Sequence, residues 1–179
     1  MKRMAEKFRD GKPSTLLLFA GIMITALLGT VVGCSVNPYT QRHQLILLPE
    51  SYDRDLGAEA YQHVVRDPKI KISQDEREIE PVKRVADRII EAAKHSKYGK
   101  TARQFEWEVS VIKDDKTANA FALPGGKIAV YTGIFPMAKN EAGLAAVLGH
   151  EVVHALARHG AERMSQNIAA DLLLTGVGV

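Results

Sequence analysis

The chain has 179 residues, a length that suits one modest domain, and carries a formal net charge of +3 at pH 7. The first twelve residues hold five basic and two acidic side chains and account for this whole excess, so the rest of the chain is neutral. It has no cluster of Lys and Arg with interleaved aromatic residues, which argues against a nucleic-acid partner, and its single cysteine excludes an intramolecular disulfide.

The N-terminal segment predicts export or a membrane anchor. Residues 15–33 form an uncharged apolar run after the basic start, as in a signal peptide or a transmembrane helix. The next residue is Cys34, and the preceding 31–33 (Val-Val-Gly) resembles the lipobox of bacterial lipoproteins. That resemblance implies that residues 1–33 are a cleaved lipoprotein signal peptide and that Cys34 is lipidated.

Lipidation of Cys34 would make a membrane a partner of the protein, because two or more acyl chains give stable anchoring. In lipoproteins of Gram-negative type, a residue other than Asp after the cysteine, here Ser35, usually accompanies export to the outer membrane. We therefore expect an outer-membrane lipoprotein that faces the periplasm, with residues 34–50 as an extended tether. The alternative is a retained helix in the inner membrane and an incidental cysteine.

The helical expectations come next in chain order. Residues 51–65 carry apolar side chains at helical spacing, and Pro68 ends this pattern. A second helix is expected over 80–97, since a proline is favoured in a first turn, and Gly99 would stop it.

Strands are expected after these helices. Residues 105–112 alternate apolar and polar side chains, the pattern of a half-buried strand. A short strand over 118–122, a turn over 123–126 and a returning strand over 127–131 follow. The order of elements predicts an α+β domain with a small antiparallel sheet followed by a long helix.

That long helix contains an HExxH motif, formed by His150, Glu151 and His154. Residues four apart lie on one helix face, so both imidazoles can bind one metal ion, and Glu151 beside them can act as a general base for hydrolysis. The motif would also arise by chance in roughly one in a few hundred chains of this length. Apolar neighbours give it the buried helical setting that favours metal binding: Val147, Leu148, Val152, Ala155 and Leu156.

A third protein ligand is expected at a catalytic zinc, but the chain offers few candidates. Glu162 and Asp171 are the only carboxylates after His154, and a continuous helix would displace them by about 12 and 25 Å along its axis. His159 would lie about 140° round such a helix, pointing away, so we interpret it as structural. Arg158 is expected to pair with a carboxylate.

Residues 118–135 (ANAFALPGGKIAVYTGIF) and 140–166, together with 37–51, resemble the HtpX-like and OMA-type zinc metallopeptidases, metallopeptidase family forty-eight. The resemblance implies a zincin-like (gluzincin) fold in which His150 and His154 bind one Zn2+ and Glu151 is the general base. A glutamate from a later helix would complete the site, beyond Val179. Residues 51–179 are then expected to be the N-terminal part of a C-terminally truncated metallopeptidase domain.

The resemblance further implies a zinc-dependent metalloendopeptidase of the cell envelope, with misfolded or misassembled envelope proteins as substrates. The strand 118–122 would be the sheet edge along which substrate lies. Asn119 and Phe121 occupy positions where this strand meets the cleft, although a turn asparagine and a core phenylalanine explain them equally well. The alternative function is a catalytically incomplete lipoprotein that binds unfolded segments along the sheet edge.

Overall fold

A computed structural model describes residues 34–38 and 41–175 of the chain. Apart from Cys34, these residues belong to one compact unit, Ser35–Val179. The expected signal peptide, residues 1–33, lies outside the described part. None of the helices within the described residues is both long and apolar enough to cross a membrane.

The central sheet has three strands: β3 (Glu108–Ile112), β4 (Ala120–Leu123) and β5 (Lys127–Tyr131). β5 lies in the middle, antiparallel to β4 and parallel to β3. The prediction of an antiparallel sheet is therefore wrong, because the observed sheet is mixed. Apolar alternation shows that a strand is half-buried but does not say which strand it pairs with or in which direction.

β4 and β5 form a tight hairpin because two glycines allow a sharp turn between them. Gly125 and Gly126 have φ angles of 86° and 91°, a backbone conformation that residues with a Cβ rarely adopt. The expected turn over 123–126 and the returning strand over 127–131 are confirmed.

β3 begins three residues later than expected, and a short helix, α4 (Gly99–Gln104), precedes it. The sequence predicted Gly99 only as a stop. The Trp107 indole N–H donates to the Ala102 carbonyl oxygen at 2.8 Å, and the rings of Phe105 and Trp107 lie 5.3 Å apart. These contacts hold Phe105 and Trp107 against α4 instead of in the sheet.

Three long helices surround the sheet. The first, α2 (Glu50–Arg66), confirms the helix expected over 51–65. The second, α3 (Glu76–Lys94), begins four residues earlier than expected because the Asp75 carboxylate caps it, accepting from the Arg77 N–H at 3.0 Å. Pro81 therefore lies inside this helix rather than at its start.

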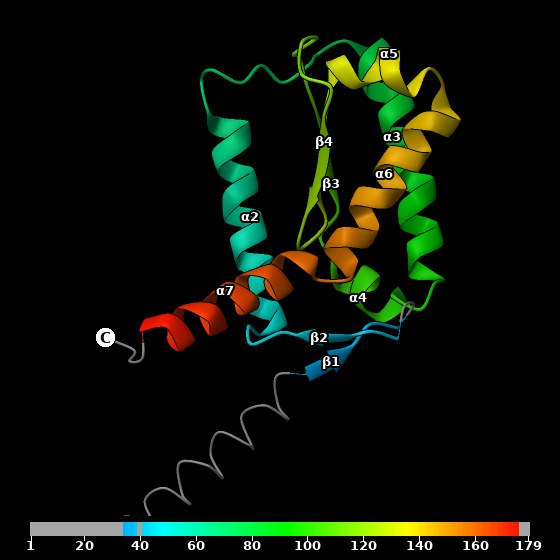
Figure 1. Cartoon of the computed structure of the whole chain (residues 1–179). Coiled ribbons are helices and arrows are strands. Elements are labelled where there is room, and N and C mark those ends of the chain that lie inside the picture. The colour runs from blue at the N-terminus through cyan, green and yellow to red at the C-terminus, as the bar shows by residue number, and fades with distance from the viewer. Residues whose placement is uncertain (1–33, 39–40, 176–179) are drawn as a thin grey trace, which may run out of the picture. The chain divides into compact units, whose positions relative to one another are not determined.

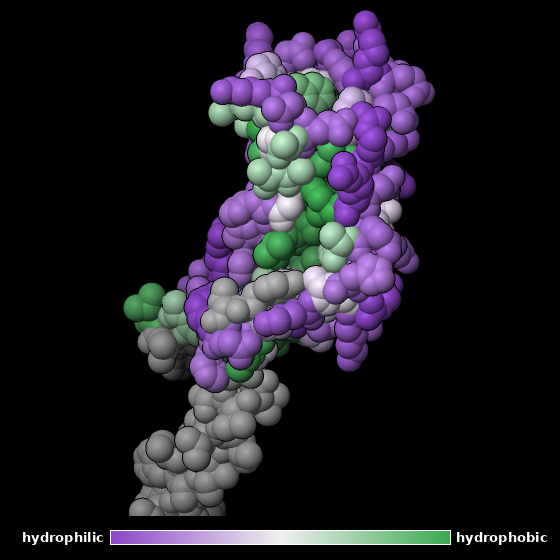
Figure 2. Space-filling model, turned by 90° about the vertical axis from the view of Figure 1, so that its right-hand side faces the viewer, coloured by the Kyte–Doolittle hydropathy of each residue, from purple (hydrophilic) through white to green (hydrophobic). Residues whose placement is uncertain are grey.

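The third helix, α6 (Glu141–Leu156), carries the HExxH motif. It follows a short 3-10 turn, η2 (Thr132–Ile134), and one helical turn, α5 (Phe135–Ala138). Figure 1 shows α2 on one face of the sheet and α3 with α6 on the other. On the side of α3 and α6, apolar surface forms a strip between polar margins (Figure 2).

The last helix, α7 (His159–Thr175), changes direction after α6 and crosses the lower end of α2 in the view of Figure 1. Two short strands, β1 (Cys34–Val36) and β2 (His43–Leu45), pair with each other at this end, and β2 packs on α7. The segment expected to be an extended tether thus joins the domain by Gln44, which is buried and donates to the Ala157 carbonyl oxygen at 3.2 Å.

Candidate active site

The HExxH residues are positioned by the burial of the opposite side of α6. Leu148 and Val152 are buried in the core, together with Ala155 and Leu156, which confirms the apolar setting expected for this helix. At its start, the Asn140 side chain accepts from the Gly143 N–H at 3.0 Å and fixes the first turn.

His150, Glu151 and His154 line a hollow of about 350 Å³ beside the end of β4. The turn after β4 forms one wall, and the start of α7 forms another. Besides the three motif residues, the lining comprises Ala122, Leu123, Pro124, Ala155, Arg158, His159, Gly160 and Arg163.

The two motif histidines face each other across one helical turn. Their Nε2 atoms lie 2.9 Å apart, and their ring centroids lie 4.4 Å apart. Two nitrogen ligands of a tetrahedral zinc ion, each about 2.0–2.1 Å from the metal, stand about 3.3 Å apart. A movement of a few tenths of an ångström thus suffices, so the pair fits as half of a zinc site.

No third ligand joins them: within residues 34–38 and 41–175, no three His, Cys, Asp or Glu side chains are placed to hold one ion. Glu162 is held elsewhere, accepting from Arg42 at 2.7 Å and from Gln44 at 2.9 Å. Burial alone would raise the pKa of Glu162, but these two hydrogen bonds outweigh it and the pKa falls below its usual value.

His159 does not point away from the site, so that expectation is wrong. α6 ends at Leu156, and Arg158 adopts a left-handed conformation with φ 56°, which turns the chain before α7 begins. The Nδ1 atom of His159 consequently lies 2.6 Å from Nδ1 of His154. The expectation failed because it assumed an unbroken helix, and the sequence signal of a break is weak: Gly160 follows the two polar residues Arg158 and His159.

Burial, followed by the repulsion that a charged His154 would exert, lowers the pKa of His159 below its usual value. The uncharged ring is therefore the favoured form of His159 at neutral pH.

Arg158 forms the carboxylate pair expected of it. Its Nε atom donates to Asp53 Oδ2 at 2.6 Å, and its Nη2 atom donates to the Leu48 carbonyl oxygen at 2.6 Å. Asp53 is buried on α2, so this pair ties the break between α6 and α7 to the opposite layer of the domain.

Asn119 and Phe121 do not line the hollow. The Asn119 side chain turns back to accept from the Ala120 N–H at 2.9 Å, and the Phe121 ring lies 6.4 Å from that of Tyr131. The residues of this hairpin that reach the hollow are Ala122, Leu123 and Pro124.

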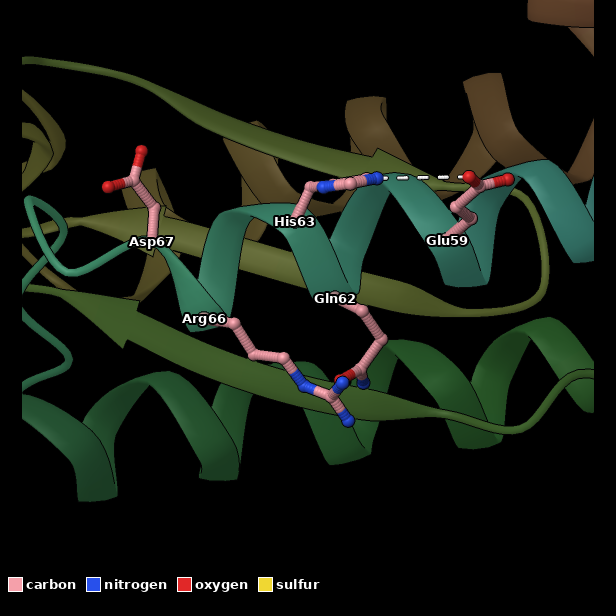
Figure 3. Close-up of a pocket in the computed structure, with 5 residues that line it drawn as sticks. All are labelled: Glu59, Gln62, His63, Arg66 and Asp67. Atoms are coloured by element: carbon pink, nitrogen blue, oxygen red, sulfur yellow. Dashed lines mark ion pairs between the residues drawn. The ribbon is translucent and has the colours of Figure 1, made fainter.

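A second hollow, of about 500 Å³, lies along α2 and is lined by polar residues (Figure 3). Its lining consists of Glu59, Gln62, His63, Arg66 and Asp67. The His63 and Glu59 side chains are 79% and 70% exposed at a separation of 3.8 Å, so their ion pair is weak. Nothing in this hollow gathers groups for catalysis.

Sequence comparison matches residues 77–179 to the profile of peptidase family M48. Over 84 residues the chain is 50% identical to the mitochondrial metalloendopeptidase OMA1 of Schizosaccharomyces pombe, covering 47% of this chain and 23% of that protein. It is 31% identical to the human mitochondrial metalloendopeptidase OMA1 over 161 residues, 87% of this chain and 30% of that protein.

A bacterial relative also matches. The chain is 42% identical over 52 residues to a putative beta-barrel assembly-enhancing protease of Vibrio cholerae, covering 29% of this chain and 11% of that protein. The chain thus spans less than a third of the length of each of these three relatives. No solved structure matches the chain significantly.

Proposed function

The chain belongs to peptidase family M48, and on this premise we propose that the hollow beside α6 is the active site of a zinc-dependent metalloendopeptidase. The observation that carries the proposal is the placement of His150, Glu151 and His154 in one hollow, with the two Nε2 atoms 2.9 Å apart. We further propose a zincin-like (gluzincin) arrangement, in which a carboxylate from outside the described residues completes the metal site.

The chain's own residues divide the work of peptide hydrolysis. A bound zinc ion supplies an acidified water and polarises the scissile carbonyl. His150 and His154 would hold the ion from one helix face. Glu151, in the same hollow, would accept the proton of the attacking water and pass it to the leaving amine.

The substrate would lie along β4, which is an edge strand. Within the described residues β4 pairs only with β5, and the Asn119 carbonyl accepts from the Tyr131 N–H at 3.0 Å. In an antiparallel pair the bonded positions alternate, so the backbone groups of Ala120 and Ala122 point to the open side, where the Asn119 side chain already accepts from the Ala120 N–H. A peptide added there would run past the histidines, with Asn119 and Phe121 as flanking contacts.

Envelope proteins that are misfolded or misassembled are the proposed substrates. Support comes from relatives in Vibrio cholerae and Yersinia pestis that are named beta-barrel assembly-enhancing proteases. The proposed location is the periplasmic face of the outer membrane, with Cys34 as the lipid-bearing residue. The lipobox-like residues 31–33 support this placement.

Replacing Glu151 by Gln tests the catalytic assignment. The amide keeps the shape of the side chain but cannot accept the proton, so cleavage of unfolded casein should fall by at least about 10²-fold. Zinc content should not change. His150→Ala should instead lose both zinc and activity, and Glu151→Gln activity within a few-fold of the parent protein would refute the assignment.

A second candidate function is a non-enzymatic protein that binds unfolded segments along the β4 edge. It is favoured by the lack of a third metal ligand among the residues that the structure describes. The two functions separate in one experiment with zinc-loaded protein and labelled casein. Fragments that Glu151→Gln abolishes indicate the peptidase, whereas casein retained intact by both proteins indicates the binder.

A further inference from the structure

Both ring nitrogens of His154 lie within hydrogen-bonding distance of another imidazole. On one side, Nε2 lies 2.9 Å from Nε2 of His150; on the other, Nδ1 lies 2.6 Å from Nδ1 of His159. The rings of His154 and His159 meet edge to face, with centroids 4.6 Å apart and an interplanar angle of 71°. A hydrogen bond between two imidazoles needs an N–H on one ring and a lone pair on the other.

We propose that His159 is a positioning residue, which accepts a hydrogen bond from Nδ1–H of His154 and thereby leaves the Nε2 lone pair of His154 free to bind metal. This inference rests on the proposed metal site. A metal-binding histidine commonly donates its other N–H to an acceptor, which sets both the tautomer and the ring orientation. His159 meets this need through Nδ1, the atom that faces His154 at 2.6 Å, provided that its own proton lies on Nε2.

His159 is not itself the missing ligand. The atom of His154 that faces His159 is Nδ1, on the opposite side of the ring from the Nε2 atom that faces His150. One ion cannot contact the lone pairs on both sides of the same imidazole. The geometry therefore separates the three histidines into a ligand pair and an outer partner.

The position of His159 is fixed by contacts on neighbouring elements. The left-handed Arg158 immediately before it is bound to Asp53 and to the Leu48 carbonyl. The nearest carboxylate in sequence, Glu162, is engaged by Arg42 and Gln44. His154 thus has a rigid acceptor whose placement does not depend on a metal.

The first test is made on the metal-free protein with nitrogen-labelled histidine. A long-range proton–nitrogen correlation spectrum at about pH 8, above the usual histidine range, should show His154 with its proton on Nδ1. His159→Leu should move that proton to Nε2, and His159→Asn should keep it on Nδ1, because the amide oxygen stands close to the former Nδ1. His63→Leu is the control, a remote and exposed histidine. Parent protein with His154 protonated on Nε2 would overturn the proposal.

The second test is equilibrium dialysis of the same proteins against zinc. The loss of an outer partner of this kind weakens metal affinity roughly 10- to 100-fold, which we expect for His159→Leu, while His159→Asn restores most of it. Equal affinity in the leucine variant and the parent would count against the proposal. If no variant binds zinc but the tautomer pattern holds, the metal site fails and the positioning contact stands.

Discussion

At the scale of single residues, the local part of the site was predictable and the non-local part was not. His150, Glu151 and His154 could be placed from sequence because four-residue spacing on a helix is a local property. His159 could not, because its position follows from the φ angle of Arg158. That angle is stabilised by Asp53, which is 105 residues away in the sequence.

Glu162 gives a prediction at this scale. Its folded-state pKa lies below its usual value of 4.5, so its ionised form stabilises the fold. The contribution is complete above the unfolded-state pKa and is lost as pH falls through the lower folded-state pKa. We expect Glu162→Gln to lower the urea midpoint at neutral pH and to match the parent protein in strong acid.

The matched control is the exposed Glu106→Gln, which should leave the neutral midpoint nearly unchanged. A Glu162→Gln protein whose deficit grows as the pH falls would contradict the sign of this argument.

At the scale of elements, close packing of α2 on the β4–β5 turn supports one wall of the hollow. A Cβ on Gly57 would lie 2.1 Å from the Pro124 carbonyl oxygen, which is a backbone clash. A Cβ on Gly149, one residue before His150, would meet nothing within 4 Å. We therefore expect substitution by alanine to have opposite effects on stability at these two helical glycines.

Gly57→Ala should destabilise the domain by about 1–3 kcal/mol, since α2 must move away from the turn. Gly149→Ala should stabilise it by about 0.5–1 kcal/mol, because alanine restricts the unfolded chain and favours the helix. Chemical denaturation of both variants measures the difference. The same sign for both would show that the spacing of α2 against Pro124 does not limit stability.

Helices and strands that depend on local sequence could likewise be predicted, whereas those that depend on distant contacts could not. The helix over 50–66 and the β4–β5 hairpin follow from spacing and turn chemistry, and both were placed well from sequence. The early start of α3 is an exception, because its cap at Asp75 is a local contact with the Arg77 N–H that the sequence could have indicated. The parallel pairing of β3 with β5 depends on which strands meet in space, which periodicity does not encode.

At the scale of the whole molecule, attachment to a membrane is the main expectation from the N-terminal sequence. If Cys34 carries the lipid, radiolabelled palmitate should enter the protein in a Gram-negative host. Cys34→Ser should abolish both the labelling and the cleavage of residues 1–33. Ser35→Asp is the matched control: it should retain the label but move the protein to the inner-membrane fraction. An unlabelled protein that still begins at Met1 would support a retained helix instead.

The contact of residues 42–47 with α7 has a consequence for the order of folding. Gln44 donates to Glu162, and the Leu47 N–H donates to Ser165 Oγ at 2.8 Å, each across 118 residues of chain. Closing a flexible loop of that length costs about 4 kcal/mol in chain entropy, by (3/2)RT ln n. The sheet and the HExxH helix bring closer partners together and can assemble first. A chain that is still emerging can therefore pass through an interval in which the histidine pair has formed while residues 42–47 and α7 remain apart.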